Sequence, residues 1–165
     1  MITELKPNEV FVFGSNSTGF HGAGSAGLAC RGDSTLFTWN NDKWFEKAMK
    51  SPIGSPDRIG KWAIYGISRG YQRGREGSSY AIETVKHPEW KRTVPLSEIK
   101  CQLLELFQFA NDNPSLSFIM TPVGARLAGW TDSEMRETWD SISDKAPKNV
   151  IVPENLYISV NTLNT

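Results

Sequence analysis

The sequence predicts a single domain over residues 1–165 with an α/β fold and a largely parallel sheet. Short apolar runs with strand character alternate along the chain with longer segments whose apolar residues recur at helical spacing. Two of the strand-like runs lead directly into loops of small residues. No internal repeat, linker or low-complexity segment interrupts this order. Strands that alternate with helices usually pair in parallel, because each helix carries the chain back across the sheet.

The composition argues against several classes of protein. The chain has 18 basic and 18 acidic side chains, whereas a nucleic-acid-binding protein usually shows a basic excess. Cys30 and Cys101 form neither a disulfide framework nor a zinc cluster, and two histidines are few for a metal site. The chain shows no signal-peptide pattern and no apolar run of the roughly 20 residues that a membrane span needs. We therefore expect a cytoplasmic protein with no metal, no cofactor and no membrane partner.

The first strand and the loop after it form the segment around which the chain is organised. Val10-Phe11-Val12-Phe13 is continuously apolar, as in a strand that is covered on both faces. Gly14-Ser15-Asn16 and the glycine-rich segment 19–24 follow, and a helix is expected from near Gly22 to about Gly32. The first N–H groups of a helix have no intrahelical partner and lie at its positive end, so this arrangement suits an anion. The alternative is a tight crossover whose glycines serve only close packing.

The middle of the chain is harder to interpret. A short helix is expected over 42–49. Residues 60–77 carry five glycines among lysines and arginines, which predicts an exposed loop, either a solvated hairpin or a flap over an anionic ligand. The next strand, 79–82, ends in Glu83-Thr84-Val85-Lys86. Ser97 is expected to be the N-cap of the helix that Asn111-Asp112-Asn113-Pro114 ends.

The last third repeats the pattern of a strand followed by a small-residue loop. The strand 116–121 runs into the loop 122–129, and the capping box Thr131-Asp132-Ser133-Glu134 predicts the start of a helix. Residues 149–152 are expected to be a last core strand, and the tail from Glu154 an edge strand.

Two such loops predict a ligand site. Ligands of open α/β sheets bind outside the carboxyl ends of the strands, so 14–24 and 122–131 could hold the two ends of a diphosphate. Gly22-x-Gly24-x-x-Gly27 formally matches the dinucleotide fingerprint, but the segment from Gly14 to His21 separates it from the strand. No Walker A lysine follows the glycines, which argues against a nucleoside triphosphatase.

The two loops resemble those of the macro-domain family. The resemblance rests on Gly22-Ala23-Gly24-x-Ala26 after one strand and Val123-Gly124-x-x-Leu127-x-Gly129 after a later one, and it covers residues 10–150. It implies a three-layer α/β/α domain with a central mixed, largely parallel sheet that binds ADP-ribose in a cleft. The first loop, with His21, is most similar to the branch that removes ADP-ribose from glutamate or thymidine through a lysine. In that branch the lysine follows a threonine at a strand end, as Lys86 nearly does here.

The resemblance carries site residues with it. The expected catalytic group is Lys86, or Asn16 and His21, which would position the distal ribose and a water. Asn16 has the alternative role of forming a turn. The expected ligand-binding residues are Gly14, Ser15, Asn16, His21, Gly22, Ala23, Gly24, Val123, Gly124, Ala125, Arg126, Leu127, Ala128 and Gly129. Aromatic candidates for stacking on adenine are Phe20, Tyr71 and Trp130.

The sequence departs from the branch pattern in three places. Val85 separates Thr84 from Lys86, Arg126 replaces a second-loop glycine, and Ala128 stands where some members have an acidic residue. Binding tolerates these changes better than catalysis does. We therefore expect binding of ADP-ribose or a related NAD-derived nucleotide, with removal of ADP-ribose from a modified protein or nucleic acid as a further activity. The alternative is a nucleic-acid or protein interaction module that uses the basic stretch 58–92.

Overall fold

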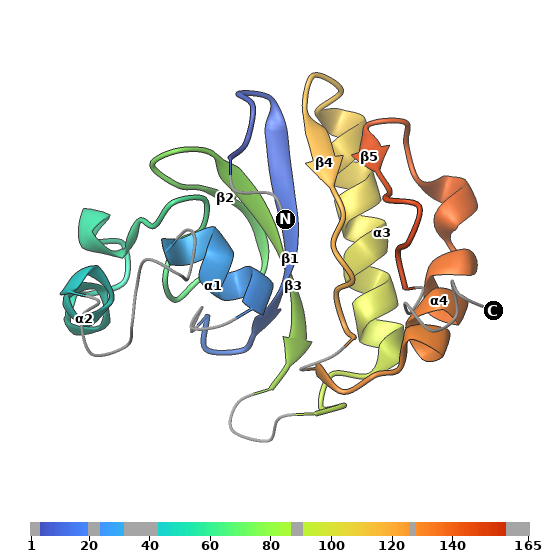
Figure 1. The fold of residues 1–165 in the computed structure, drawn as a ribbon, viewed down its shortest axis with the longest axis horizontal. Helices are drawn as coiled ribbons and strands as arrows, with labels where there is room; N and C mark the ends of the chain where they lie inside the picture. Colours follow the sequence, from blue (N-terminus) through green and yellow to red (C-terminus); the bar gives the residue numbers. More distant parts are fainter. Residues whose placement is uncertain (1–3, 20–23, 32–42, 87–90, 126–127, 158–165) are drawn as a thin grey trace.

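The computed structural model of the chain describes residues 4–19, 24–31, 43–86, 91–125 and 128–157 (Figure 1). Five strands form one sheet in the order β2-β3-β1-β4-β5. The strands are β1 (Glu9–Asn16), β2 (Gly70–Arg73), β3 (Ser78–Val85), β4 (Ser117–Ile119) and β5 (Val150–Ile151). The β2–β3 pair is antiparallel and the other three pairs are parallel. The predicted α/β class, with a mixed and largely parallel sheet, is confirmed.

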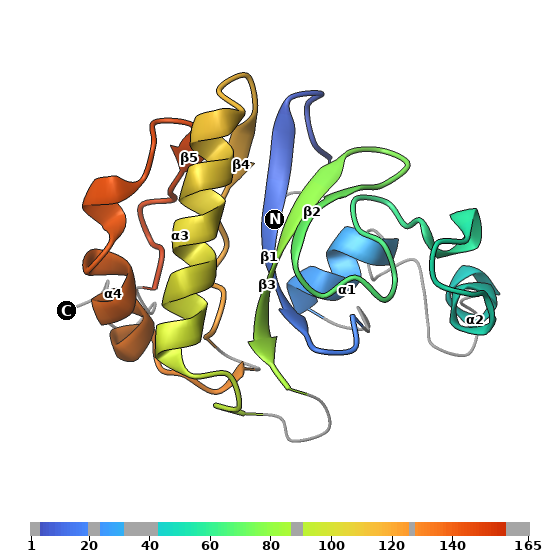
Figure 2. The same cartoon turned by 180° about the vertical axis from the view of Figure 1, so that it is seen from behind.

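Helices cover both faces of this sheet. The α-helices are α1 (Gly24–Arg31), α2 (Lys43–Lys50), α3 (Leu96–Asp112) and α4 (Asp132–Asp140). The 3-10 turns are η3 (Pro56–Arg58) and η5 (Ser143–Lys145). Figures 1 and 2, which show the sheet from opposite sides, place α1 on one face and α3 on the other. α2 lies apart from the sheet, next to η3.

The central strand β1 supplies both cores through the alternation of its side chains. Val10 and Val12 belong to the core that α3 and α4 cover, whereas Phe11 and Phe13 belong to the core under α1. All four side chains are buried. The continuous apolar run in the sequence is therefore explained by a strand that is covered on both faces, as predicted.

Residues 60–77 are not the exposed loop that the glycines predicted. Trp62 and Ala63 are buried, and their backbone N–H groups both donate to the carbonyl of Ala29, at 2.6 and 3.0 Å. The N–H of Lys61 donates to Cys30 O at 2.8 Å. Carbonyls in the last turn of a helix lack intrahelical partners, so this segment closes the end of α1. Residues 70–73 then pair with β3 in an antiparallel hairpin, and the flap over an anionic ligand stays a prediction.

A buried glutamine completes the open edge of β3. β2 ends its pairing at Ala81, so the backbone of Glu83 has no strand beside it on that edge. The Gln102 side chain of α3, which is 2% exposed, takes that place. Its Oε1 accepts from Glu83 N at 2.6 Å, and its Nε2 donates to Glu83 O at 2.8 Å. The Gln102 amide thus makes the two hydrogen bonds that a neighbouring strand would make near the carboxyl end of β3.

The second half confirms one predicted cap and corrects other boundaries. Thr131 caps α4 in a full capping box with Glu134. By contrast, α3 begins at Leu96 with Pro95 as its N-cap, so Ser97 does not cap it. The predicted strand 116–121 is shortened to β4. The predicted core strand 149–152 is the two-residue edge strand β5, in which Ile151 is 46% exposed.

The C-terminal tail is described as far as Tyr157. Residues 154–157 form turns and no strand, and Leu156 and Tyr157 are buried. The rest of the edge strand predicted from Glu154, residues 158–165, lies outside the described residues. This tail therefore contributes to the core under α3 and α4.

Candidate ligand-binding edge of the sheet

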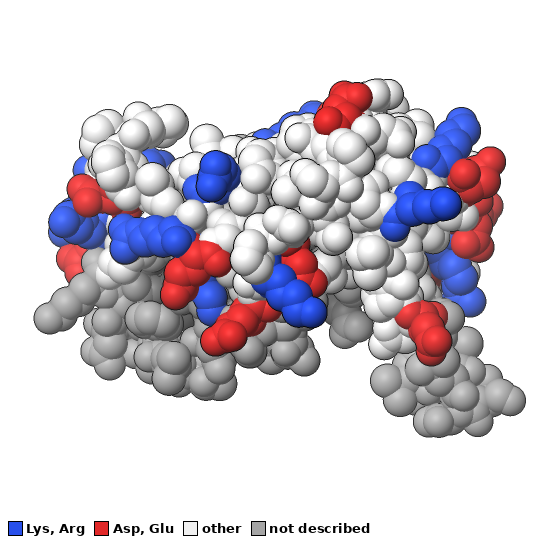
Figure 3. Space-filling view, turned by 90° about the horizontal axis from the view of Figure 1, so that it is seen from above, with Lys and Arg blue, Asp and Glu red and all other residues white. Residues whose placement is uncertain are grey.

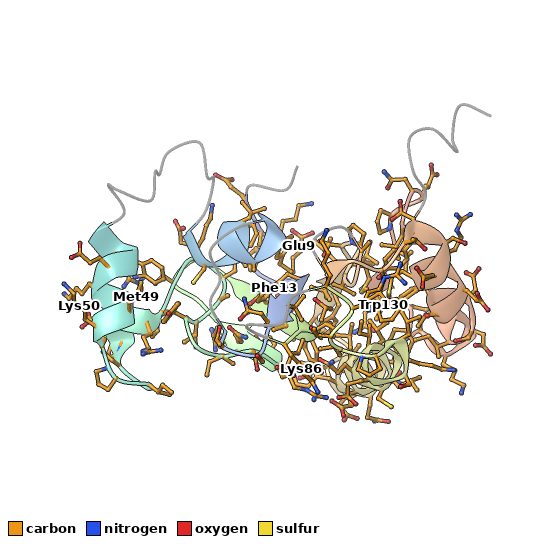
Figure 4. The ribbon with its side chains drawn as sticks, turned by 90° about the horizontal axis from the view of Figure 1, so that it is seen from below. Glu9, Phe13, Met49, Lys50, Lys86 and Trp130 are labelled. Atoms are coloured by element: carbon orange, nitrogen blue, oxygen red, sulfur yellow. The ribbon has the colours of Figure 1, made fainter. Side chains whose placement is uncertain are left out.

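Three of the four parallel strands, β3, β1 and β4, lie side by side and end at one edge of the sheet, with β1 between the other two. β3 flanks β1 on one side and β4 on the other, so the strand order reverses at β1. Such a switch point is where open α/β sheets bind ligands. Figure 4 looks onto this edge from below, with Phe13 of β1 near its centre. The loops predicted to bind a ligand both leave the sheet here.

Gly14 is the point at which the three strand ends meet. A Cβ atom on Gly14 would lie 3.3 Å from Thr84 Oγ1 of β3 and 3.8 Å from the Cα of Val123 in the loop after β4. Contact with Thr84 would be tighter than side chains normally accept, so a glycine fits this position best. The end of β3 and the second loop therefore converge on bare backbone at the end of β1.

The first loop is held by hydrogen bonds to residues from the β2–β3 region. Ser15 Oγ donates to Ser68 O at 2.8 Å, and Thr84 Oγ1 donates to Ser15 O at 3.3 Å. The N–H of Gly66 donates to Gly19 O at 2.9 Å. Residues 66–68 therefore lie beside the first loop. These hydrogen bonds connect the amino-terminal part of the predicted flap to that loop.

Asn16 forms the turn that was its alternative role. Its Oδ1 accepts from Thr18 N at 3.1 Å and from Thr18 Oγ1 at 2.7 Å. A side-chain oxygen that accepts from the backbone two residues on defines an Asx turn. The turn directs the chain from β1 into the first loop, and the expected contact of Asn16 with the distal ribose stays a prediction.

The second loop turns sharply as it leaves β4. The N–H of Val123 donates to Thr121 O at 2.7 Å, and the N–H of Trp130 donates to Gly124 O at 3.2 Å. Gly124 has a φ of +85°, and a Cβ there would lie 2.6 Å from Met135 Sδ of α4. The positive φ requires glycine at this position, and the Met135 side chain packs directly against it.

Arg92, which the sequence analysis did not single out, fastens the far end of the second loop. Its N–H donates to Ala128 O at 2.7 Å, and its Nε donates to Gly129 O at 3.0 Å. Its guanidinium donates two bonds to the Glu134 carboxylate, at 2.9 and 3.3 Å, and lies 4.9 Å from the centre of the Trp130 ring. One face of Trp130 is therefore covered by Arg92. Because the segment that carries Arg92 is remote in sequence from the loop, only the fold reveals the contact.

The other stacking candidates are placed differently. Tyr71 lies on β2 against Phe109, and its hydroxyl pairs with Ser78 Oγ at 2.9 Å at the amino end of β3. The structure therefore puts Tyr71 away from the edge at which the parallel strands end. Phe20 lies outside the described residues.

Side chains of α4 and its N-cap already satisfy N–H groups at the start of this helix. Glu134 N donates to Thr131 Oγ1 at 3.0 Å, and Thr131 N donates to Glu134 Oε1 at 3.1 Å. These bonds from Thr131, first its backbone and then its side chain, lower the pKa of Glu134, and the positive charge of Arg92 lowers it further. A carboxylate already occupies the positive end of this helix. The first turn of α1 contains no acidic residue.

Lys86 lies at the same edge, directly after β3. Val85 pairs with Asn16 of β1, and the N–H of Lys86 donates to Thr93 Oγ1 at 2.7 Å. The Lys86 side chain is exposed. Figure 4 shows Lys86 on the sheet side of the molecule, far from Met49 and Lys50 of α2. The structure brings Lys86 next to the first loop but gives it no buried environment.

Several expected site residues lie outside the described residues: His21, Gly22, Ala23, Arg126 and Leu127. Gly24 is described as the first residue of α1. Of the remaining members, the structure places Val123 beside Gly14 at the end of β1. In the part of the chain that is described, no group of three or more His, Cys, Asp or Glu side chains could hold a metal ion. No helix in this part has the length and apolar character needed to cross a membrane.

Comparisons with protein-family models, with curated proteins and with solved structures found no match to this chain.

Proposed function

We propose that the carboxyl edge of the sheet binds ADP-ribose or a related NAD-derived nucleotide, with its diphosphate between residues 19–25 and 122–130. The observation that carries this proposal is the convergence of the second loop and the end of β3 on the end of β1, where Val123 and Thr84 pack against Gly14. Both loops that leave this packed junction are rich in small residues, and a phosphate can approach backbone closely only where side chains are small. The resemblance of both loops to those of macro domains supports the same ligand.

The start of α1 supports an anion in this position. The helix begins at Gly24, its first turn has small residues and no acidic side chain, and it follows β1 at the same edge. Unpaired N–H groups and the helix dipole stabilise a phosphate at such an end. Binding through backbone groups needs no excess of basic side chains, which agrees with the zero net charge of the chain.

A further proposed activity is release of ADP-ribose from a modified protein or nucleic acid. It is favoured by the position of Lys86 at the edge, one residue beyond the pairing of Val85 with Asn16. In this step Lys86 Nζ would form a bond to the anomeric carbon of the distal ribose while the bond to the modified group breaks, and the proton shed by Nζ would pass to the departing group. Water would then hydrolyse the bond between Lys86 and the ribose, which releases ADP-ribose and restores the lysine. Replacement of Lys86 by alanine should abolish release while sparing the binding of free ADP-ribose. Equal release by both proteins would show that Lys86 is only a surface charge.

The alternative of a nucleic-acid interaction module receives less support. Three arginines of the basic stretch are engaged within the protein: Arg58 donates to Ser51 O and Tyr65 O, Arg69 pairs with Glu98 and Glu105, and Arg92 pairs with Glu134. Figure 3 shows basic and acidic side chains interspersed on the face at the amino ends of the strands. A continuous basic surface, as nucleic-acid binding requires, is not visible on that face.

A calorimetric titration tests the proposed function. ADP-ribose, AMP and NAD are titrated in turn into the full chain, and a labelled DNA and RNA are tested in parallel by mobility shift. We expect saturable one-to-one binding of ADP-ribose that is tighter than that of AMP, because AMP lacks the second phosphate and the distal ribose. A salt-sensitive nucleic-acid shift without any nucleotide binding would favour the interaction module instead.

A further inference from the structure

Tyr157 reaches the second loop from the C-terminal tail. Its side chain is buried, with 1% of its surface exposed, and its hydroxyl donates to Val123 O at 2.6 Å. Val123 is the residue at which the second loop turns away from β4, and its Cα lies beside Gly14. Neither the loop motifs nor the resemblance singled out Tyr157. The contact joins the tail directly to the candidate site.

The backbone of Tyr157 is itself unusual. Its φ is 58°, in the left-handed region that residues with a Cβ atom seldom adopt. Such a conformation persists where the surrounding structure holds it, and this is common near functional sites. Burial, with a smaller contribution from the charge of Asp132, raises the pKa of the Tyr157 hydroxyl. The hydroxyl therefore stays protonated and able to donate at neutral pH.

The hydrogen bond to Val123 O fixes the orientation of a whole peptide group. In a trans peptide the C=O of one residue and the N–H of the next point in opposite directions. Since Val123 O points toward Tyr157, the N–H of Gly124 points away from Tyr157. The φ of +85° at Gly124 and its contact with Met135 then set the path of the loop.

We propose that Tyr157 is a positioning residue that keeps the second loop in the conformation needed for ligand binding. The inference rests on the proposed function, because the ligand is the nucleotide diphosphate proposed above. Tyr157 acts through Val123 and makes no contact with the ligand itself. Removal of the Tyr157 hydroxyl alone keeps the ring packed in the core and frees the Val123–Gly124 peptide from its hydrogen bond.

Tyr157→Phe tests this role, because it removes the hydroxyl and keeps the ring. Tyr71→Phe is the matched control: it removes a tyrosine hydroxyl bonded to Ser78 at the amino end of β3, away from the second loop. Hydrogen exchange is measured on the ligand-free proteins at the amides of Val123, Ala125 and Trp130, which are bonded within or just before the loop. ADP-ribose affinity is measured by calorimetry, and folding by circular dichroism.

We expect Tyr157→Phe to speed exchange at these amides by about tenfold and to weaken ADP-ribose binding by about tenfold, because a buried carbonyl loses its partner. Tyr71→Phe should leave both values within about twofold of the wild type. Unchanged exchange in Tyr157→Phe, equal effects in both variants, or loss of folding in Tyr157→Phe alone would each overturn the positioning role. If the wild type binds no nucleotide, the proposed function fails, whereas the exchange measurement still decides whether Tyr157 holds the loop.

Discussion

The two loops of the candidate site have similar positions in the fold and different electrostatics. Each is rich in small residues and lies between the end of a parallel strand and the start of a helix. At α4 the capping box of Thr131 and Glu134 places a carboxylate at the positive end of the helix, and Arg92 balances its charge. At α1 the first turn has no acidic residue. A motif of small residues therefore does not by itself define an anion site, because the first helical turn decides whether the end is already occupied.

This difference assigns separate roles to the two loops. The start of α4 is capped by its own residues. The loop before it is held by hydrogen bonds from Tyr157 to Val123 O and from Arg92 to the carbonyls of Ala128 and Gly129. Under the proposed function, the start of α1, which has no acidic residue in its first turn, is the end that binds the phosphate. We expect substitutions at α1 to act mainly on binding and substitutions at α4 to act mainly on stability.

The strongest test places a carboxylate at the start of α1. Gly24→Glu should weaken ADP-ribose binding at least about a thousandfold, or about 4 kcal/mol, because bulk and negative charge would meet the phosphate. Ser133→Glu, which adds a carboxylate to the first turn of α4, is the matched control and should leave affinity unchanged. Calorimetry on both folded variants measures the effect. Equal losses in the two variants would remove the distinction between the helix starts.

The next test concerns the support of β3 beside the first loop. Gln102→Leu should lower the free energy of unfolding by about 3 kcal/mol, since the N–H and C=O of Glu83 both lose a buried partner. Gln108→Leu changes an exposed glutamine of the same helix and should shift stability by less than about 0.5 kcal/mol. Urea denaturation compares the two. A small effect of Gln102→Leu would mean that water replaces the amide.

The cap of α4 should matter less. Thr131→Val removes the hydroxyl that accepts from Glu134 N and should cost about 1 kcal/mol of stability. Ser97→Ala provides the comparison at α3, where Ser97 is not the cap, and its effect should stay below about 0.5 kcal/mol. Chemical denaturation of both variants measures these costs. A larger loss at Ser97 would contradict the helix start at Leu96.

The smallest expected effect is a change in acid sensitivity at α4. The pKa of Glu134 is lowered from its ordinary value of 4.5 in the folded protein, so its contribution to stability is present above that value. That contribution is lost as the pH falls through the folded pKa. Glu134→Gln should therefore flatten the decline of the melting temperature below pH 4.5. A variant with the same acid profile as the wild type would show that Glu134 contributes no such dependence.

Local patterns in the sequence were sufficient for several elements. The apolar run Val10 to Phe13 identified the central strand, because a short strand covered on both faces hides successive apolar side chains. The spacing of Thr131 and Glu134 identified the start of α4, because both capping bonds form within one turn of chain. The exposed loop predicted from the glycines of 60–77 was wrong. Gly60 and Gly74 instead allow close backbone contacts with α1 and with Lys61.

By itself the sequence determined the α/β class, the two loops and the capping box, because these depend on residues that are near one another along the chain. The tertiary structure alone decided that Gly14 lies between Thr84 and Val123, that Gln102 stands in for a strand, and that Arg92 and Tyr157 hold the second loop. These contacts join residues that are remote in sequence. No periodicity or short motif encodes them, because they form only when the sheet order brings their segments together.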